Sequence, residues 1–142
     1  MLDDLNVIKQ CDPSDTLGGI LDISKQAVYE IELVPGDNQR REFKNVVLAG
    51  MGGSALAADM IKVLTDGWLH IPLAVVKGYD LPGFVGEETL VITISHSGNT
   101  EETLSCYQQA LKKQACLAAL STGGSLIERA KSDRAAYVEV PS

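Results

Sequence analysis

Positive charge is scarce in this chain of 142 residues. It has 12 lysines and arginines against 19 aspartates and glutamates, which gives a formal net charge of −7. No Lys/Arg-rich stripe is present that would neutralise the phosphates of a nucleic acid. The pair Arg40-Arg41 is flanked by Asp37 and Glu42, as in a solvated loop. We therefore expect no nucleic-acid partner, and any bound phosphate has to be held by local dipoles.

Long hydrophobic runs and paired cysteines are also lacking. No apolar stretch reaches the roughly 18–20 residues of a membrane span, and the first residues do not resemble a secretory signal. The three cysteines, Cys11, Cys106 and Cys116, have neither metal-ligand nor Cys-x-x-Cys spacing. We therefore expect no membrane partner and a cytoplasmic protein with reduced thiols, in which Cys116 is a buried apolar residue.

What the chain does have is a regular alternation of strand-like and helix-like segments. After a helix predicted from Asp15 to about Leu33, apolar runs typical of buried strands occur near residues 45–49, 72–76, 89–94, 115–120 and 135–140. The helix after the first run has an apolar face of Leu56, Ala57, Met60, Ile61 and Leu64. A later helix, near residues 99–113, is expected to turn Leu104, Tyr107 and Leu111 inward.

Strands that alternate with helices form right-handed units on a parallel sheet. We predict an α/β fold of three layers, α/β/α, with a flavodoxin-like, five-stranded parallel sheet in the order 2-1-3-4-5. An N-terminal helical segment, about residues 1–40, precedes the sheet of about residues 44–140 in one domain, 1–142. In this order the first and third strands are neighbours at the switch point where ligands bind.

Two Gly/Ser loops follow these two neighbouring strands, each just before a helix. The first contains Gly52, Gly53 and Ser54, and the second is the run 95–100, Ser-His-Ser-Gly-Asn-Thr. A helix start presents unpaired amides with partial positive charge, glycine allows close approach, and hydroxyls add hydrogen bonds. The sequence therefore predicts a phosphate site that faces both loops, with an attached substrate between them.

The second loop also has a purely structural interpretation. Ser97 or Thr100 can serve as the N-cap of a helix whose first turn carries Glu101 and Glu102. The run Ser121-Thr122-Gly123-Gly124 repeats the design and is either a turn and cap or a contact to the far end of a ligand. His96 is typical of a polar rim residue, and a catalytic role for it or for the two glutamates stays open.

A dinucleotide site is the main rival interpretation. Residues 50–55 match the G-x-G-x-x-A fingerprint. The carboxylate that usually follows the second strand is missing, because that strand ends Val76-Lys77-Gly78. Lys77 is suited to a 2′-phosphate, so the rival is NADP. A dinucleotide site would leave the second loop, residues 95–100, without a function.

The two loops resemble those of the sugar isomerase (SIS) domain, and most closely the N-terminal half of the bifunctional phosphoglucose/phosphomannose isomerase family. The resemblance is carried by residues 49–55 and 95–103, and more weakly by 78–82 and 121–124. It implies that a phosphosugar is bound by Gly52, Gly53, Ser54, Ser95, Ser97, Gly98, Asn99 and Thr100, without metal, nucleotide or other cofactor.

The resemblance also implies a reaction: isomerisation of glucose or mannose 6-phosphate to fructose 6-phosphate through an enediol. The acid/base Glu, the ring-opening His and an Arg of the family match no position of this chain, so its catalytic residues are unknown. Where the family usually has Tyr, this chain has His96. We expect a chain that binds hexose phosphate but is catalytically incomplete until a second SIS domain or a homodimer partner completes the site. The alternative is a non-catalytic sugar-phosphate sensor.

Overall fold

The computed structural model describes residues 4–20, 28–37 and 42–141. The chain divides into two compact units, Met1–Ile31 and Glu32–Ser142. Within the described ranges, no helix combines the length and the apolar character that a membrane span requires.

The N-terminal unit contains short helices. Helix α1, Leu5–Cys11, begins after Asp4, whose carboxylate accepts a hydrogen bond from the Asn6 amide at 3.0 Å. A further helical stretch covers residues 16–20, and the carboxylate of Asp12 accepts hydrogen bonds from the first amides of this stretch. These bonds lower the pKa of Asp12, with the Leu17 amide as the largest cause.

The predicted extension of this helix to Leu33 is wrong. Part of it lies outside the described residues, but residues 29–32 have no regular structure and Leu33–Val34 form strand β1. Strand β1 pairs antiparallel with β6, Ala136–Glu139, through Leu33 opposite Val138 and Val34 opposite Tyr137. Sheet pairing therefore overrides the helical spacing of the apolar residues.

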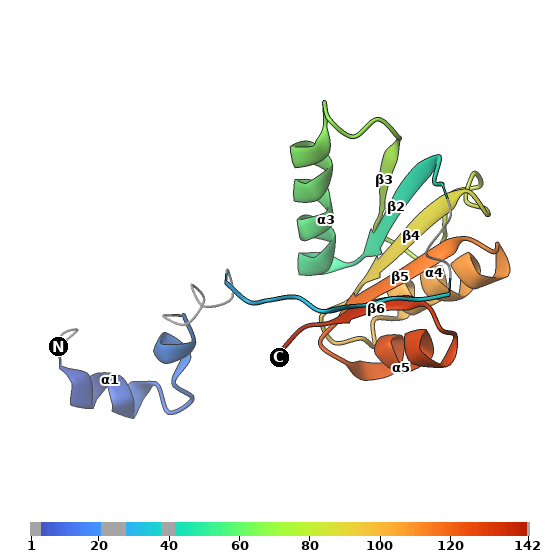
Figure 1. The fold of residues 1–142 in the computed structure, drawn as a ribbon. Helices are drawn as coiled ribbons and strands as arrows, with labels where there is room; N and C mark the ends of the chain where they lie inside the picture. Colours follow the sequence, from blue (N-terminus) through green and yellow to red (C-terminus); the bar gives the residue numbers. More distant parts are fainter. Residues whose placement is uncertain (1–3, 21–27, 38–41, 142) are drawn as a thin grey trace. The chain divides into compact units, whose positions relative to one another are not determined.

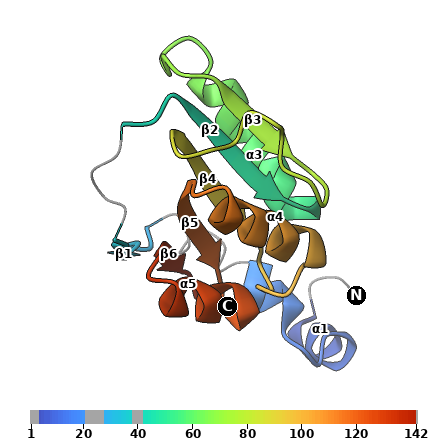
Figure 2. The ribbon, with the colours of Figure 1, turned by 90° about the vertical axis from the view of Figure 1, so that its right-hand side faces the viewer.

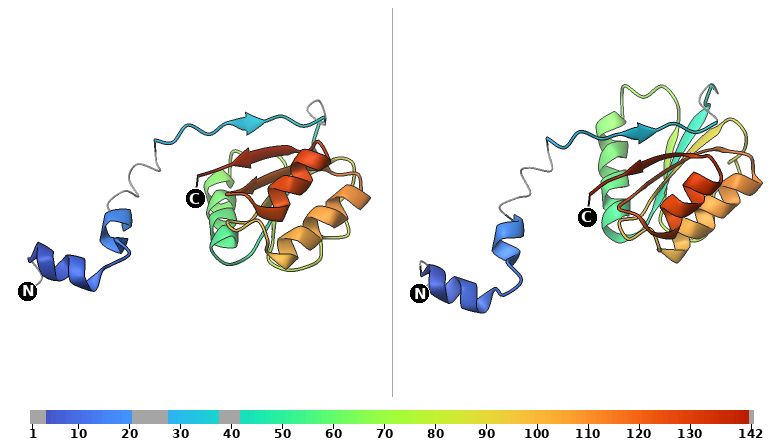
Figure 3. Two further views of the ribbon diagram at one scale, coloured as in Figure 1. Left: turned by 90° about the horizontal axis from the view of Figure 1, so that it is seen from below. Right: turned by 60° about the horizontal axis from the view of Figure 1, so that its bottom comes forward.

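The second unit is built on one mixed sheet (Figure 1). Its strands lie in the order β1-β6-β5-β4-β2-β3, and all pairs except β1–β6 are parallel. The remaining elements are β2 Asn45–Gly50, α3 Gly52–Thr65, β3 Leu73–Val76, β4 Thr89–Ile94, α4 Glu101–Lys112, β5 Cys116–Ser121 and α5 Gly124–Ser132. The predicted three-layer α/β class is confirmed, but the sheet has a sixth, antiparallel strand at its edge (Figure 3).

The helices cover the two sheet faces unequally. Helix α3 lies on one face, and α4 and α5 lie on the other (Figure 2). The larger buried cluster lies on the α4–α5 face and the smaller one on the α3 face. The segment from β3 to β4 contributes Leu81 and Val85 to the larger cluster, in place of a helix.

Helix α3 packs on the sheet through its alanines, and the predicted packing face is wrong. Ala55 and Ala58 are buried, whereas the large side chains of the predicted face are exposed: Leu56, Met60, Ile61 and Leu64. The small alanine side chains let α3 lie close to β2 and β3. Because the alanines take up the face toward the sheet, the large side chains of the helix point to the outside. On α4 the predicted inward face is confirmed for Tyr107, which is fully buried, and for Leu104, which packs on the core. It is wrong for Leu111, which is 41% exposed.

Burial of the cysteines predicts the result of a thiol-labelling experiment. Cys11 is exposed, whereas Cys106 and Cys116 are buried. Burial is the main cause that raises the pKa of Cys106, to about 11, so little reactive thiolate exists near pH 8. We expect a chromogenic disulfide reagent to label one thiol rapidly in the native chain and all three in denaturant. The Cys11→Ser variant should lose the rapid phase, and two rapid equivalents in the wild type would contradict the assignment.

Candidate functional site

The two Gly/Ser loops start side by side at the carboxyl edge of the sheet. Strands β2 and β4 are parallel neighbours, and their last residues, Gly50 and Ile94, are paired. A Cβ atom on Gly50 would lie 2.8 Å from the Ile94 carbonyl oxygen, so only glycine allows this approach without movement. Each loop then leads into a helix, α3 or α4. The structure thus brings the predicted residues of both loops together.

The first loop leaves the start of α3 open. Gly52 has a φ of +55° and, like Gly53, is exposed. No side chain caps α3; the Ser54 and Ala55 amides bond to the Met51 carbonyl at 3.1 and 3.3 Å. Within the described part of the chain, the Gly52 and Gly53 amides and the Ser54 hydroxyl have no hydrogen-bond partner. These are donors available to an anion.

Ser95 shapes the second loop from the inside. It is buried, its hydroxyl shares a 2.9 Å hydrogen bond with Thr100 Oγ1, and the same oxygen accepts the Gly98 amide at 3.1 Å. Gly98 makes the turn with a φ of +69°. Ser97 is exposed, and its hydroxyl oxygen accepts the Asn99 amide at 3.3 Å. The accessible groups of this loop are therefore Ser97 and the residues at the start of α4.

The start of α4 is also uncapped. Thr100 occupies the N-cap position but makes no side-chain cap bond, so neither it nor Ser97 caps the helix in the way that the structural interpretation required. Among the described residues, nothing accepts a hydrogen bond from the Glu101 or Glu102 amide. Two uncapped helix starts, of α3 and α4, thus lie next to each other.

The start of α5 differs, because the second loop caps it. Asn99 Oδ1 accepts the Ser125 amide at 3.1 Å, and the Gly98 carbonyl accepts the Leu126 amide at 2.9 Å. The hydroxyls of Ser121 and Thr122 donate to the His96 carbonyl at 3.3 and 2.7 Å. The third loop is therefore a turn tied to the second loop, and the second loop supplies the cap of α5. Sequence reasoning missed the bridging role of Asn99, since its partner lies 26 residues away.

Lys77 and Glu101, charged residues near the two loops, have polar partners, and the two histidines are exposed. Lys77 Nζ forms an exposed ion pair with the Asp59 carboxylate. Glu101 accepts a hydrogen bond from the Tyr79 hydroxyl at 3.3 Å. His96 is exposed, and so is His70, which lies at the opposite edge of the sheet.

Two surface hollows lie away from the loops, at the amino-terminal edge of the sheet. One, of about 320 Å³, includes Lys62, His70 and Leu73 in its lining; the other, of about 290 Å³, includes Asn45 and Phe84. Neither contains a predicted site residue. The two loops lie at the carboxyl edge instead, which is where open α/β sheets bind their ligands.

Residues 41–140 match the SIS domain among known protein families. The chain belongs to the SIS domain family. Bifunctional phosphoglucose/phosphomannose isomerases are similar to it: that of Caldicellulosiruptor bescii is 42% identical over 118 residues, which is 82% of this chain and 35% of that protein. That of Thermoplasma volcanium is 44% identical over 85 residues, 60% of this chain and 27% of that protein.

More distant relatives extend the family likeness. Glutamine–fructose-6-phosphate aminotransferase of Corynebacterium diphtheriae is 31% identical over 127 residues, 87% of this chain and 20% of that protein. The crystal structure of tagatose-6-phosphate ketose/aldose isomerase from Escherichia coli shares the fold, with a TM-score of 0.60, 20% identity, and coverage of 89% of this chain and 35% of that one. The SIS chain spans about a third of the length of the isomerase relatives that it matches.

Proposed function

We propose that this SIS domain binds a hexose 6-phosphate and forms the phosphosugar-binding part of an aldose–ketose isomerase that interconverts glucose or mannose 6-phosphate and fructose 6-phosphate through an enediol. One observation carries the proposal: two adjacent helix starts, of α3 and α4, are uncapped, while the third, of α5, is capped. Unpaired amides at two neighbouring helix starts suit a phosphate dianion in a chain of net charge −7.

The predicted residues divide into two groups within this proposal. Four residues contact the phosphate or the sugar through open amides or hydroxyls at the carboxyl edge: Gly52, Gly53, Ser54 and Ser97. Thr100 contacts the ligand through its amide, because its hydroxyl is shared with Ser95. The others shape the second loop and act through it: Ser95, Gly98 and Asn99. Preorganised donors bind an anion more tightly, since no further ordering is needed on binding.

We propose further that the chain alone is catalytically incomplete and that a second SIS domain or a homodimer partner supplies the missing groups. This is supported by the relatives, about three times as long, that carry the isomerase name. The carboxylates at the start of α4, Glu101 and Glu102, have ordinary structural roles as first-turn residues. No catalytic role is assigned to them or to His96.

Thermal unfolding of this chain with added ligands tests the binding proposal. Fructose 6-phosphate at 100 times its dissociation constant should stabilise the fold by about 2.7 kcal/mol, and raise the melting temperature by roughly 5–10 °C. Inorganic phosphate should give a smaller shift and NADPH none. A shift with NADPH alone would favour the dinucleotide interpretation of the first loop. The absence of any shift with fructose 6-phosphate would contradict the proposal.

Matched variants locate the site. Ser97→Ala should weaken fructose 6-phosphate binding about tenfold, since it removes a hydroxyl that hydrogen-bonds a charged group. Thr100→Ala should also weaken it, because it removes the hydroxyl that holds Ser95 in the second loop. Ser132→Ala, at the far end of α5, should leave the affinity unchanged. Enzyme-like isomerisation of fructose 6-phosphate by the isolated chain would show that the incompleteness proposal is wrong.

A further inference from the structure

The segment Gly78–Pro82 matches the SIS resemblance, yet the phosphate site does not use it. It leaves β3 at the carboxyl edge of the sheet and runs along the middle of α4. Three side chains of α4 hold its backbone: Ser105 Oγ donates to the Tyr79 carbonyl at 2.9 Å, and Gln109 Nε2 donates to the same oxygen at 2.6 Å. The third is Cys106, whose Sγ donates to the Gly78 carbonyl at 3.3 Å.

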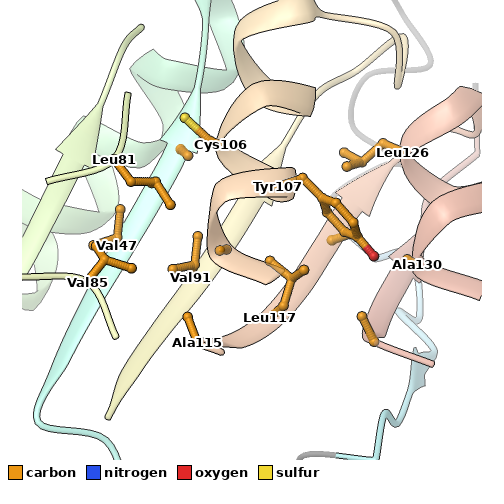
Figure 4. Close-up of a cluster of buried hydrophobic side chains, with 14 residues drawn as sticks. Val47, Leu81, Val85, Val91, Cys106, Tyr107, Ala115, Leu117, Leu126 and Ala130 are labelled. Atoms are coloured by element: carbon orange, nitrogen blue, oxygen red, sulfur yellow. The ribbon is translucent and has the colours of Figure 1, made fainter. Parts of the chain in front are cut away.

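The segment is also fixed at Leu81, after Tyr79. The Leu81 amide donates to Gln109 Oε1 at 3.1 Å, so the Gln109 side chain bridges two backbone groups of the segment. The Leu81 side chain is buried in the larger core cluster, beside Cys106 and Val47 (Figure 4). A loop held by α4 and by the core keeps one backbone conformation, and the side chain between these anchors, that of Tyr79, is presented from a fixed position.

Tyr79 stands beside the start of α4. Its side chain is exposed, at 51%, and its hydroxyl lies 3.3 Å from Glu101 Oε2, on the residue that directly follows Thr100. The charge of Glu102, partial desolvation and the charge of Glu101 raise the pKa of Tyr79, so the phenol stays protonated near neutral pH. An open aromatic ring with a hydroxyl at its tip offers an apolar face and a polar group together.

We propose that Tyr79 contacts the sugar of the bound ligand and makes the site prefer a sugar phosphate to inorganic phosphate, and that Gln109 is a positioning residue that holds Tyr79 in place. The inference rests on the proposed function. Sugars present C–H faces and hydroxyl groups, and the Tyr79 ring and its hydroxyl match both. The phosphate, by contrast, is held by the helix starts, so the two parts of the ligand are recognised by different elements.

Calorimetric titration of variants with two ligands tests this division. Tyr79→Ala should weaken fructose 6-phosphate binding at least fivefold and change inorganic phosphate binding less than twofold. Gln109→Ala should act in the same direction, and Tyr79→Phe, which keeps the ring, should lie between Tyr79→Ala and the wild type. Phe84→Ala is the matched control, because Phe84 is a similarly exposed aromatic of the same connection at the opposite edge of the sheet. It should leave both affinities unchanged.

The outcomes separate this inference from the proposed function. Wild-type affinity for fructose 6-phosphate in both Tyr79 variants would overturn the role of Tyr79 while the phosphosugar site stands. Equal weakening of both ligands would also overturn it, since Tyr79 would then act through the start of α4 alone. A wild-type chain that binds phosphate but gains nothing from the sugar would overturn both proposals. Melting temperatures of the variants show that each is folded.

Discussion

Replacing Gly98 with alanine should lower the melting temperature by roughly 10 °C and abolish detectable binding of fructose 6-phosphate. Gly98 has a φ of +69°, where a side chain is strained. An added Cβ would overlap the Gly123 carbonyl oxygen and come within 2.9 Å of Ser121 Oγ. The carbonyl group of Gly98 also caps α5, by accepting the Leu126 amide. Strain and overlap together should cost about 3 kcal/mol, and the displaced loop no longer aligns the donors of the site.

The control for this variant is Gly83→Ala. Gly83 lies in the connection between β3 and β4, its φ is not in the left-handed region, and apart from its chain neighbours no atom lies within 4 Å of an added Cβ. We expect its melting temperature to stay within about 2 °C of the wild type and its ligand binding to be unchanged. A Gly98→Ala chain that binds fructose 6-phosphate with wild-type affinity would contradict the role given to the second loop.

Replacing Tyr107 with alanine should destabilise the chain by about 4 kcal/mol, which lowers the melting temperature by roughly 12 °C. Its side chain is fully buried and lies between α4, β5 and α5, next to Leu117, Leu126 and Ala130 (Figure 4). Truncation leaves a cavity at the point where both helices of this face meet the sheet. Chemical denaturation of the wild type and the variant measures the free energy of unfolding directly.

Two further variants separate the ring of Tyr107 from its hydroxyl. The hydroxyl donates to Asp133 Oδ2 at 3.0 Å, and burial is the main cause that raises the pKa of Tyr107. Tyr107→Phe removes only this bond and should cost about 1 kcal/mol. Phe84→Ala removes an exposed ring and should cost less than about 1 kcal/mol. If Tyr107→Phe proved as costly as Tyr107→Ala, the stability would depend on the hydrogen bond rather than on packing.

Sequence patterns predicted the parallel core of the fold because they report local properties. Apolar runs without alternation indicate strands buried on both faces, and β2, β4 and β5 lie within one or two residues of the predicted ranges. The pattern did not predict β1, since Leu33 also fits the spacing of a helix. It also chose the wrong face of α3, because hydrophobicity alone does not show that small alanines bring the helix closest to the sheet.

The candidate site divides in the same way. The sequence by itself determined that glycines and hydroxyls follow two parallel strands and precede two helices, which are local facts of composition and order. Only the tertiary structure decided which donors stay open: Asn99 reaches across to cap α5, while α3 and α4 are left without a cap. It also placed Tyr79 beside Glu101, 22 residues away. Hydrogen bonds between residues far apart in the chain depend on how strands are ordered and helices packed, and no local pattern encodes that.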